Sequence, residues 1–221
     1  MKTCVLIPAY NEARAIGSVV RKIKEEGFAV IVVDDGSFDD TAKKAAESGA
    51  LVMRHIKNLG KGASLKEGFE HITRMTDFEA VIIMDGDGQH NPADIKKFMA
   101  RAEEFGEDLI MGNRMTLVKD MPFVRLATNR FTSFLLSTIC AQHIPDTQCG
   151  FRLIKRGVLN ALKLESNKYD LESEMLIKAS REKFKISSVP VETIYRGETS
   201  NIHPIKDALR FMFLLVKSYF N

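Results

Sequence analysis

The sequence of 221 residues contains few cysteines and no long uncharged apolar run. Its three cysteines, Cys4, Cys140 and Cys149, are scattered without the paired spacing of a disulfide framework or a thiolate zinc site. Such cysteine usage fits a reducing cytosol. No uncharged apolar stretch reaches the roughly 18 residues of a membrane-spanning helix. The first expected strand begins at Thr3, so we expect no signal peptide.

The chain also lacks a strong charge imbalance and any internal repeat. Its net charge is only +3, from 32 basic and 29 acidic residues, which is too small to indicate a nucleic-acid-binding protein. The fractions of apolar residues, 45%, and of charged residues, 28%, are ordinary for a globular protein. The length therefore suggests a single domain over residues 1–221.

Strand and helix patterns alternate along the first half of the chain. Short apolar runs predict strands, amphipathic segments predict helices, and after Arg114 the alternation is expected to break. The alternation predicts an α/β fold with a parallel sheet and right-handed crossovers. The expected strands cover 3–7, 29–33, 51–54, 80–84 and 108–112, and the expected helices cover 11–26, 41–48, about 62–75 and 92–105.

Polar loops follow four of these strands, where ligands gather in parallel sheets. Each loop alone would be read as turn chemistry or a helix cap. Four on one sheet edge favour a ligand site. In one of them, Asp85 and Asp87 stand one residue apart with a glycine after each, and such a turn can hold a divalent cation through oxygen ligands. The loops are Pro8–Glu12, Asp34–Ser37, Asp85–His90 and Gly112–Arg114.

Six motifs carry a resemblance that covers residues 3 to about 204. Leu6–Glu12 (LIPAYNE), Val32–Ser37 (VVDDGS) and Asp85–Asp87 (DGD) resemble the family 2 inverting glycosyltransferases. Asn58–Gly62 (NLGKG), Asp146–Arg152 (DTQCGFR) and Tyr195–Ser200 (YRGETS) are similar to the branch that makes polyprenyl-phosphate sugars, the dolichyl-phosphate mannosyl- and glucosyltransferases. The resemblance implies a GT-A-type Rossmann-like fold, with a mostly parallel sheet flanked by helices.

By this resemblance, residues 1–113 bind a nucleotide sugar. Carboxylates accept hydrogen bonds from ring N–H groups and ribose hydroxyls. Asp35 is the first candidate for this contact, whereas Asp34 could equally cap its own turn. Lys61 is expected either to reach the diphosphate or to be a solvated surface lysine. The full donor-binding set is Pro8, Tyr10, Glu12, Asp34, Asp35, Gly36, Ser37, Lys61 and Asp85.

A metal ion is expected at the turn after the fourth strand. The leaving diphosphate develops negative charge, which Mg²⁺ or Mn²⁺ would neutralise as a Lewis acid. The resemblance assigns the metal to Asp87 and Gln89, and Asp85 to the sugar or ribose. Two protein ligands suffice, because Mg²⁺ usually retains waters. His90 is a weaker candidate, since a hard cation prefers carboxylates.

Residues 114–221 are expected to bind the acceptor. Apolar-rich segments near 122–141 and 204–220 predict amphipathic helices, and the first carries Arg125 and Arg130. Such helices fit a membrane interface, although packing on the core or a dimer face are alternatives. We favour the interface because the resembling enzymes take a lipid acceptor.

The expected acceptor needs no strong catalytic base. The second pKa of a phosphate monoester is near ~6, so its oxygen is largely ionised at cytosolic pH. Arginine pairs bidentately with phosphate, and the resemblance assigns such contacts to Arg114, Arg130 and Arg196, leaving Arg152 a structural role. Asp146 could orient the acceptor, act as a weak base, or cap a turn. The catalytic set is Asp87, Arg114, Arg130, Asp146 and Arg196.

The sequence thus predicts inverting hexose transfer from UDP-glucose or GDP-mannose to dolichyl or undecaprenyl phosphate. The enzyme would be cytoplasmic and peripheral on the cytosolic face of a membrane, with or without a separate membrane-anchoring subunit and without nucleic acid. The Asp146–Arg152 motif leans toward UDP-glucose. Alternatives are the same fold with a soluble acceptor, nucleotidyl transfer, and a non-catalytic binding module.

Overall fold

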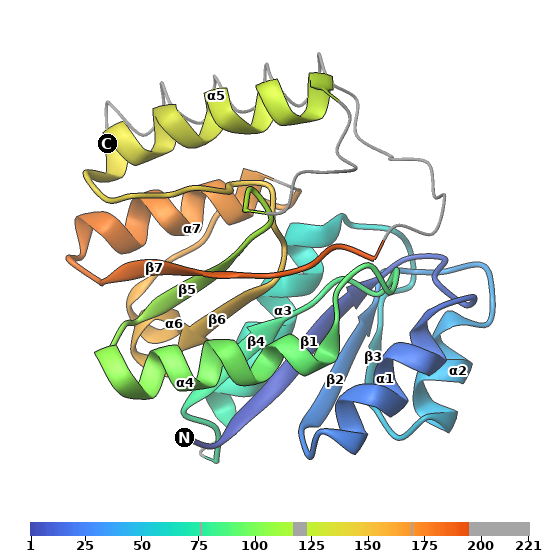
Figure 1. Ribbon diagram of the computed structural model, residues 1–221. Coiled ribbons are helices and arrows are strands. Elements are labelled where there is room, and N and C mark those ends of the chain that lie inside the picture. The colour runs from blue at the N-terminus through green and yellow to red at the C-terminus, as the bar shows by residue number, and fades with distance from the viewer. Residues whose placement is uncertain (76, 117–122, 169, 195–221) are drawn as a thin grey trace.

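The computed structural model describes residues 1–75, 77–116, 123–168 and 170–194. Within these residues a seven-stranded sheet has the order β3-β2-β1-β4-β6-β5-β7, and helices cover both of its faces (Figure 1). The strands are β1 Thr3–Ala9, β2 Ala29–Asp34, β3 Leu51–Arg54, β4 Ala80–Ile83, β5 Leu109–Asn113, β6 Arg152–Lys155 and β7 Ile186–Pro190. The helices are α1 Ile16–Glu25, α2 Thr41–Glu47, α3 Lys61–Arg74, the 3₁₀ turn η1 Pro92–Asp94, α4 Ile95–Phe105, α5 Phe123–Cys140, α6 Arg156–Ala161 and α7 Asp170–Arg181.

The mostly parallel sheet expected from the sequence is confirmed. Strand β1 pairs in parallel with β2 and β4, and β2 pairs in parallel with β3. The loops that follow these strands therefore meet at one edge of the sheet. Strand β6 is antiparallel to both of its neighbours, β4 and β5.

Two expectations about element boundaries were wrong. Strands and helices continue to alternate after Arg114, because β6 inserts between β4 and β5, β7 pairs with β5 at the edge of the sheet, and α6 and α7 lie between β6 and β7 in the sequence. These strands have weak patterns: β6 is four residues flanked by charge, and β7 contains two serines and a proline, which an edge strand tolerates. The first helix begins at Ile16 rather than Asn11, since Asn11 has a φ of 57° that a helix excludes.

The two faces of the sheet bury separate apolar cores, because alternate side chains of each strand point to opposite faces. One core joins Val5 and Ile7 of β1 to apolar residues of α1, α2 and α4. The other joins Cys4 and Leu6 of β1 to residues of α3, α5, α6 and α7. Both layers are needed for the central strands, whose side chains are buried throughout.

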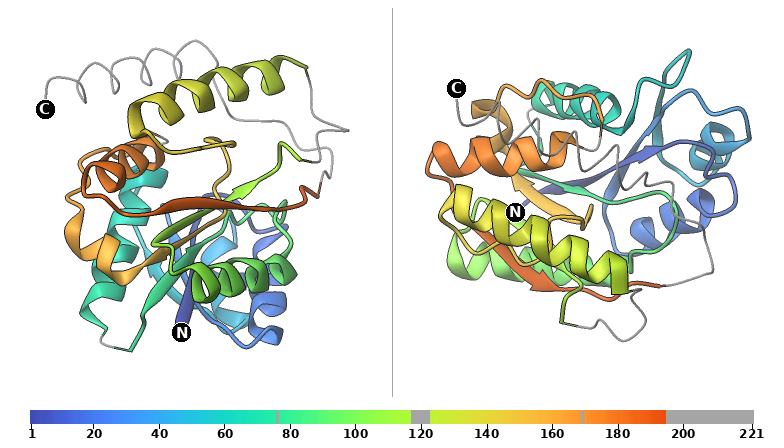
Figure 2. Two further views of the ribbon diagram at one scale, coloured as in Figure 1. Left: turned by 60° about the vertical axis from the view of Figure 1, so that its left-hand side comes forward. Right: turned by 90° about the horizontal axis from the view of Figure 1, so that it is seen from above.

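Among the described elements, helix α5 is the outermost on the α7 side (Figures 1 and 2). It buries Leu136 and Cys140 in the second core. No helix among the described residues is long and apolar enough to cross a membrane. The expected helix near 204–220 lies outside the described residues.

A close backbone contact fixes the start of α3. A Cβ at Gly62 would lie 2.5 Å from the carbonyl carbon of Asn167 and 2.7 Å from the nitrogen of Lys168. The N–H of Ala63 also donates to the carbonyl of Asn167 at 3.1 Å. The segment that leads into α7 is therefore clamped against the first turn of α3.

We predict that Gly62→Ala destabilises the protein by about 1–3 kcal/mol, the usual cost of overpacking against rigid neighbours. Elsewhere in a helix the same change stabilises by roughly 0.5–1 kcal/mol. Gly157→Ala in α6 is the matched control, because a Cβ there meets nothing within 4 Å. Urea unfolding midpoints measure both effects, and equal shifts for the two variants would contradict the clamp.

Candidate active site

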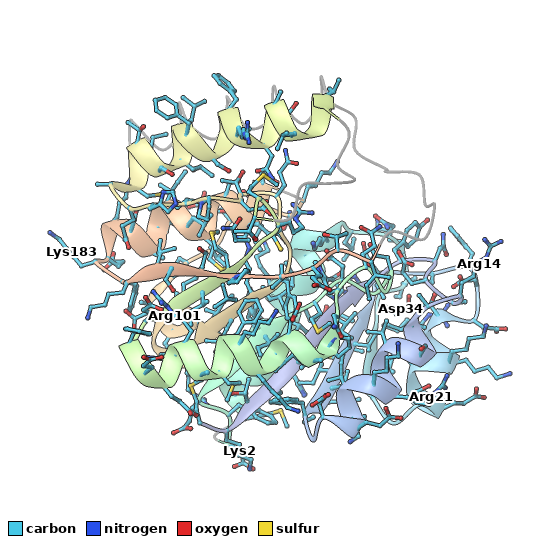
Figure 3. The ribbon with its side chains drawn as sticks, in the orientation of Figure 1. Lys2, Arg14, Arg21, Asp34, Arg101 and Lys183 are labelled. Carbon is cyan, nitrogen blue, oxygen red and sulfur yellow. The ribbon has the colours of Figure 1, made fainter. Side chains whose placement is uncertain are left out.

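The carboxylate of Asp34, the last residue of β2, holds the loop that follows this strand. Asp34 is 0% exposed, and its Oδ1 accepts from the N–H of Ser37 at 3.2 Å. Its Oδ2 lies 3.0 Å from Nε of Arg54 in β3, and Figure 3 shows Asp34 at this end of the sheet. The turn-capping alternative is therefore what the structure shows for Asp34.

Asp35 is turned into the protein as well. Its carboxylate accepts from the N–H groups of Leu59 and Gly60, both at 2.8 Å, and Oδ1 lies 2.7 Å from Nδ1 of His55. Asp35 thus ties β2 to the loop that precedes Lys61. The expected nucleobase contact of Asp35 stays a prediction, and a ligand would have to share this carboxylate with these donors.

His55 and Glu67 complete this tie and were not singled out from the sequence. Nε2 of His55 lies 2.6 Å from Oε2 of Glu67. Burial alone would lower the pKa of His55, but its hydrogen bonds to Asp35 and Glu67 raise it above the ordinary value. An isolated histidine after a strand carries no pattern, so only the folded geometry identifies it.

The loop after β1 is bound to the loop after β2. The N–H of Asn11 donates to Oγ of Ser37 at 2.9 Å, and the N–H of Glu12 donates to Oγ1 of Thr41 at 2.8 Å. Pro8 is buried within β1, whereas Tyr10 is exposed. Gly36 has a φ of +72°, and a Cβ there would lie 2.5 Å from the backbone of Lys57. The structure therefore brings together the Leu6–Glu12 motif, the Val32–Ser37 motif and the loop that begins near Lys57.

An open hollow of about 370 Å³ lies beside these loops, at the ends of β2 and β3. The side chain of Phe38 at its border is 90% exposed, and the ring of Tyr10 meets it edge-on at 6.4 Å between centroids. Exposed aromatic rings beside a hollow can take a flat apolar ligand. The lining residues are Gly36, Ser37, Phe38, Arg54, His55 and Ile56.

Lys61 occupies the centre of the site. Its ammonium lies 2.6 Å from Oδ1 of Asp85, after β4, and 2.9 Å from Oε1 of Glu172, in α7. Burial alone would lower the pKa of Lys61, but the two carboxylates raise it, so the ammonium is charged. The reading of Lys61 as a solvated surface lysine is excluded.

Asp85 is held from both sides. Its Oδ2 lies 3.2 Å from Nε2 of His90. Burial alone would raise the pKa of Asp85, but the charge of Lys61 and the hydrogen bond from His90 hold it far below the usual range. A Cβ at Gly150 would lie 2.6 Å from Oδ2 of Asp85. The Asp146–Arg152 motif therefore packs directly against the donor motif.

The turn that contains Asp87 and Gln89 has the donor atoms that a hard cation needs. Oδ1 of Asp87 accepts from the N–H of Gln89 at 2.9 Å, which closes the turn with both side chains half-buried. In the described part of the chain, no cluster of three or more His, Cys, Asp or Glu side chains is arranged to hold a metal. The carboxylate and amide oxygens of these two residues fit Mg²⁺ or Mn²⁺ that takes its other ligands from water and phosphate.

On the acceptor side, Arg114 is buried against Asp146. Nε of Arg114 donates to Oδ2 at 2.8 Å, and Nη2 donates to Oδ1 at 2.9 Å. Asn129 of α5 donates to the same Oδ1 at 2.7 Å. Burial alone would raise the pKa of Asp146, but the hydrogen bonds and charge of Arg114 and the hydrogen bond of Asn129 hold it below the usual range. Such a carboxylate is a poor proton acceptor and a good anchor.

The other expected arginines lie differently. Arg130 is exposed, and its neighbour Asn129, rather than Arg130 itself, faces Asp146. Arg152 is fully buried and donates to the carbonyls of Thr147, Cys149 and Glu172, which confirms its structural role. Arg196 lies outside the described residues.

Helix α5 presents apolar side chains to solvent above this network. Phe131 is 60% exposed and Phe134 is 69% exposed. Large exposed apolar residues that gather on one element mark an interaction surface. The surface is made by Val124, Phe131, Phe134 and Ile139.

Comparisons with known proteins find named relatives along most of the chain. Glycosyltransferase AglJ of Haloferax volcanii is 32% identical over 210 residues, which cover 92% of this chain and 67% of that protein. A UDP-N-acetylglucosamine–dolichyl-phosphate N-acetylglucosaminyltransferase of Methanococcus voltae is 28% identical over 214 residues, covering 86% of this chain and 85% of that protein.

A solved structure shares the fold. Glucosyl-3-phosphoglycerate synthase from Mycobacterium tuberculosis, in complex with Mn²⁺, UDP and glucosyl-3-phosphoglycerate, matches with a TM-score of 0.76 and 20% identity, covering 98% of this chain and 79% of that chain. At this identity the likeness shows the fold alone. Residues 4–163 match the model of Glycosyl transferase family 2. The chain therefore belongs to glycosyl transferase family 2 and is a glycosyltransferase.

Proposed function

We propose that this enzyme transfers a hexose, with inversion, from a nucleotide sugar to a polyprenyl phosphate at the cytosolic face of a membrane. The observation that carries the proposal is that one motif contacts both halves of the site: Gly150 packs against the charged Lys61–Asp85 pair, and Asp146 pairs with the buried Arg114. The name of the Methanococcus voltae relative, which includes dolichyl phosphate, supports a lipid acceptor.

In this proposal residues 1–113 bind the donor. The base and ribose lie near the hollow beside Ser37 and His55, and Lys61 meets the diphosphate. Asp87 and Gln89 would hold Mg²⁺ or Mn²⁺, which would supply a Lewis acid for the charge that develops on the diphosphate. The name of the Methanococcus voltae relative, which includes UDP, supports a uridine donor such as UDP-glucose over GDP-mannose.

Residues 114–221 bind the acceptor, whose phosphate is already ionised. One of its oxygens attacks the anomeric carbon, while the bond from that carbon to the diphosphate breaks and its electrons leave with the nucleoside diphosphate. Direct attack inverts the anomeric centre. No proton has to be removed, so Asp146 serves to hold Arg114 in place. Arg114 then binds the acceptor phosphate together with Arg130 and Arg196.

The enzyme works as a peripheral membrane protein in this proposal, with the exposed face of α5 in the interface. Aromatic side chains on an amphipathic helix bind at the boundary between headgroups and acyl chains. A separate membrane-anchoring subunit is compatible with the same arrangement.

We predict that the protein forms a lipid-linked sugar from a short polyprenyl phosphate when it is assayed against UDP- and GDP-sugars with Mg²⁺ or Mn²⁺. Asp87→Asn should lower turnover at least about 100-fold, because a metal ion supplies several kcal/mol of transition-state stabilisation. Asp77→Asn is the control, since Asp77 is an exposed residue paired with Lys2. No lipid-linked product with any donor would overturn the proposal, and product on a soluble acceptor alone would favour the alternative.

The Asp146→Asn variant tests whether Asp146 anchors Arg114 or acts as a catalytic base. Loss of a charge-assisted hydrogen bond costs roughly 1.5–3 kcal/mol, so we expect the KM for polyprenyl phosphate to rise about 10- to 100-fold. The rate should still increase with pH through ~6 as the acceptor ionises. Circular dichroism checks that the variant is folded. An unchanged KM with a turnover that collapses at every pH would identify Asp146 as the base.

The double change Phe131→Ser with Phe134→Ser tests the membrane surface. Each exposed phenylalanine contributes up to about 1.5–3 kcal/mol when buried, so we expect at least about tenfold weaker co-sedimentation with anionic liposomes. Phe105→Ser in α4 is the control, because Phe105 is also exposed. Measurements at two salt concentrations separate the charge contribution. Failure of the unmodified protein to bind at low salt would argue against the interface.

A further inference from the structure

The ammonium group of Lys61 carries one positive charge but contacts two carboxylates. Asp85 approaches its Nζ at 2.6 Å and Glu172 at 2.9 Å. Glu172 is buried, and its other oxygen lies 3.6 Å from Nη2 of Arg152, whose N–H groups already donate to three backbone carbonyls. Glu172 therefore faces both cations, and its shorter contact is with Lys61.

Glu172 is fixed in this position by packing. It belongs to α7, and the segment just before α7 is clamped against Gly62, the residue that follows Lys61. On the opposite side of the pair, Gly150 leaves no room for a Cβ next to Nζ of Lys61, at 3.0 Å. The packing of these backbone segments thus holds the carboxylate against the ammonium.

The charge on the ligand changes during the proposed reaction. The diphosphate of a nucleotide sugar carries about two negative charges, and the free nucleoside diphosphate carries nearly three at neutral pH, because a terminal phosphate has its second pKa near ~6. A lysine at the diphosphate therefore binds the product more strongly than the substrate. A fixed carboxylate beside that lysine repels the product more strongly than the substrate.

We propose that Glu172 is a positioning residue that restrains Lys61 and so promotes release of the nucleoside diphosphate. The proposal rests on the proposed function, in which Lys61 meets the diphosphate. In the step that precedes release, the bond from the acceptor oxygen to the anomeric carbon forms, and the bond from that carbon to the diphosphate breaks. The extra negative charge then stays on the diphosphate, where Glu172 opposes it.

Isothermal titration with UDP and GDP, with Mg²⁺ and again with EDTA, tests this role. Glu172→Gln keeps the shape of the side chain and removes its charge, so we expect the nucleoside diphosphate to bind about tenfold tighter. The KM for the nucleotide sugar should fall less, and product inhibition should increase. A purely structural role predicts weaker binding instead, so tightening distinguishes the two.

Three further variants complete the design. Lys61→Met should weaken nucleotide binding, and adding Glu172→Gln to it should tighten binding less than Glu172→Gln does alone, because Glu172 restrains Lys61 in addition to repelling the ligand. Glu70→Gln is the control, because it removes the same charge from an exposed pair with Arg74. Glu70 is nine residues after Lys61 in α3, about 13 Å away along the helix axis, so this change should leave binding unchanged. Glu172→Asp draws the carboxylate back and should tighten binding about two- to threefold, which provides a test if Glu172→Gln does not fold.

The outcomes separate the two proposals. If the unmodified protein binds neither UDP nor GDP, the proposed function fails. If it binds them and Lys61→Met weakens binding, but neither Glu172 variant tightens it, the role of Glu172 is overturned and the proposed function stands.

Discussion

The ion pair between Lys61 and Asp85 is the interaction on which the rest of the site depends. It joins the start of α3 to the end of β4, and Glu172 of α7 closes it from the acceptor side. The side chains of Lys61 and Asp85 are largely shielded from water, with 16% and 29% of their surfaces exposed. The charges therefore hold three elements that are far apart in the sequence in one arrangement.

Glycines explain how backbone segments of this site can approach one another, and the ion pair, so closely. Gly62 admits the segment before α7, Gly36 admits the loop at Lys57, and Gly150 admits the Lys61–Asp85 pair itself. At each point a Cβ would stand within 3.0 Å of a backbone or charged atom. The glycine-rich composition of these motifs is thus a packing requirement, in addition to any contact with a phosphate.

The sequence was informative where a repeating pattern exists. Apolar runs located β1 to β5, and turn residues after them located the loops that meet at the sheet edge. Four-residue β6 and serine-containing β7 carry too little periodicity to be recognised. Glu172 and His55 had no local signal either, because their roles depend on Lys61 and Asp35, which are distant in sequence. The resemblance supplied the reaction class, and the structure supplied the partners.

The two sides of the site use arginine and lysine differently. Arg114 is locked by two hydrogen bonds from its planar guanidinium to Asp146, which suits its proposed role of receiving a phosphate in a fixed direction. Lys61 is a point charge shared between two carboxylates, which suits its proposed role beside a diphosphate that gains charge and leaves. The lowered pKa of Asp146 keeps it ionised and bound to Arg114, which fits the proposed reaction, whose acceptor must arrive already deprotonated. A phosphate meets that requirement at neutral pH, and a sugar hydroxyl does not.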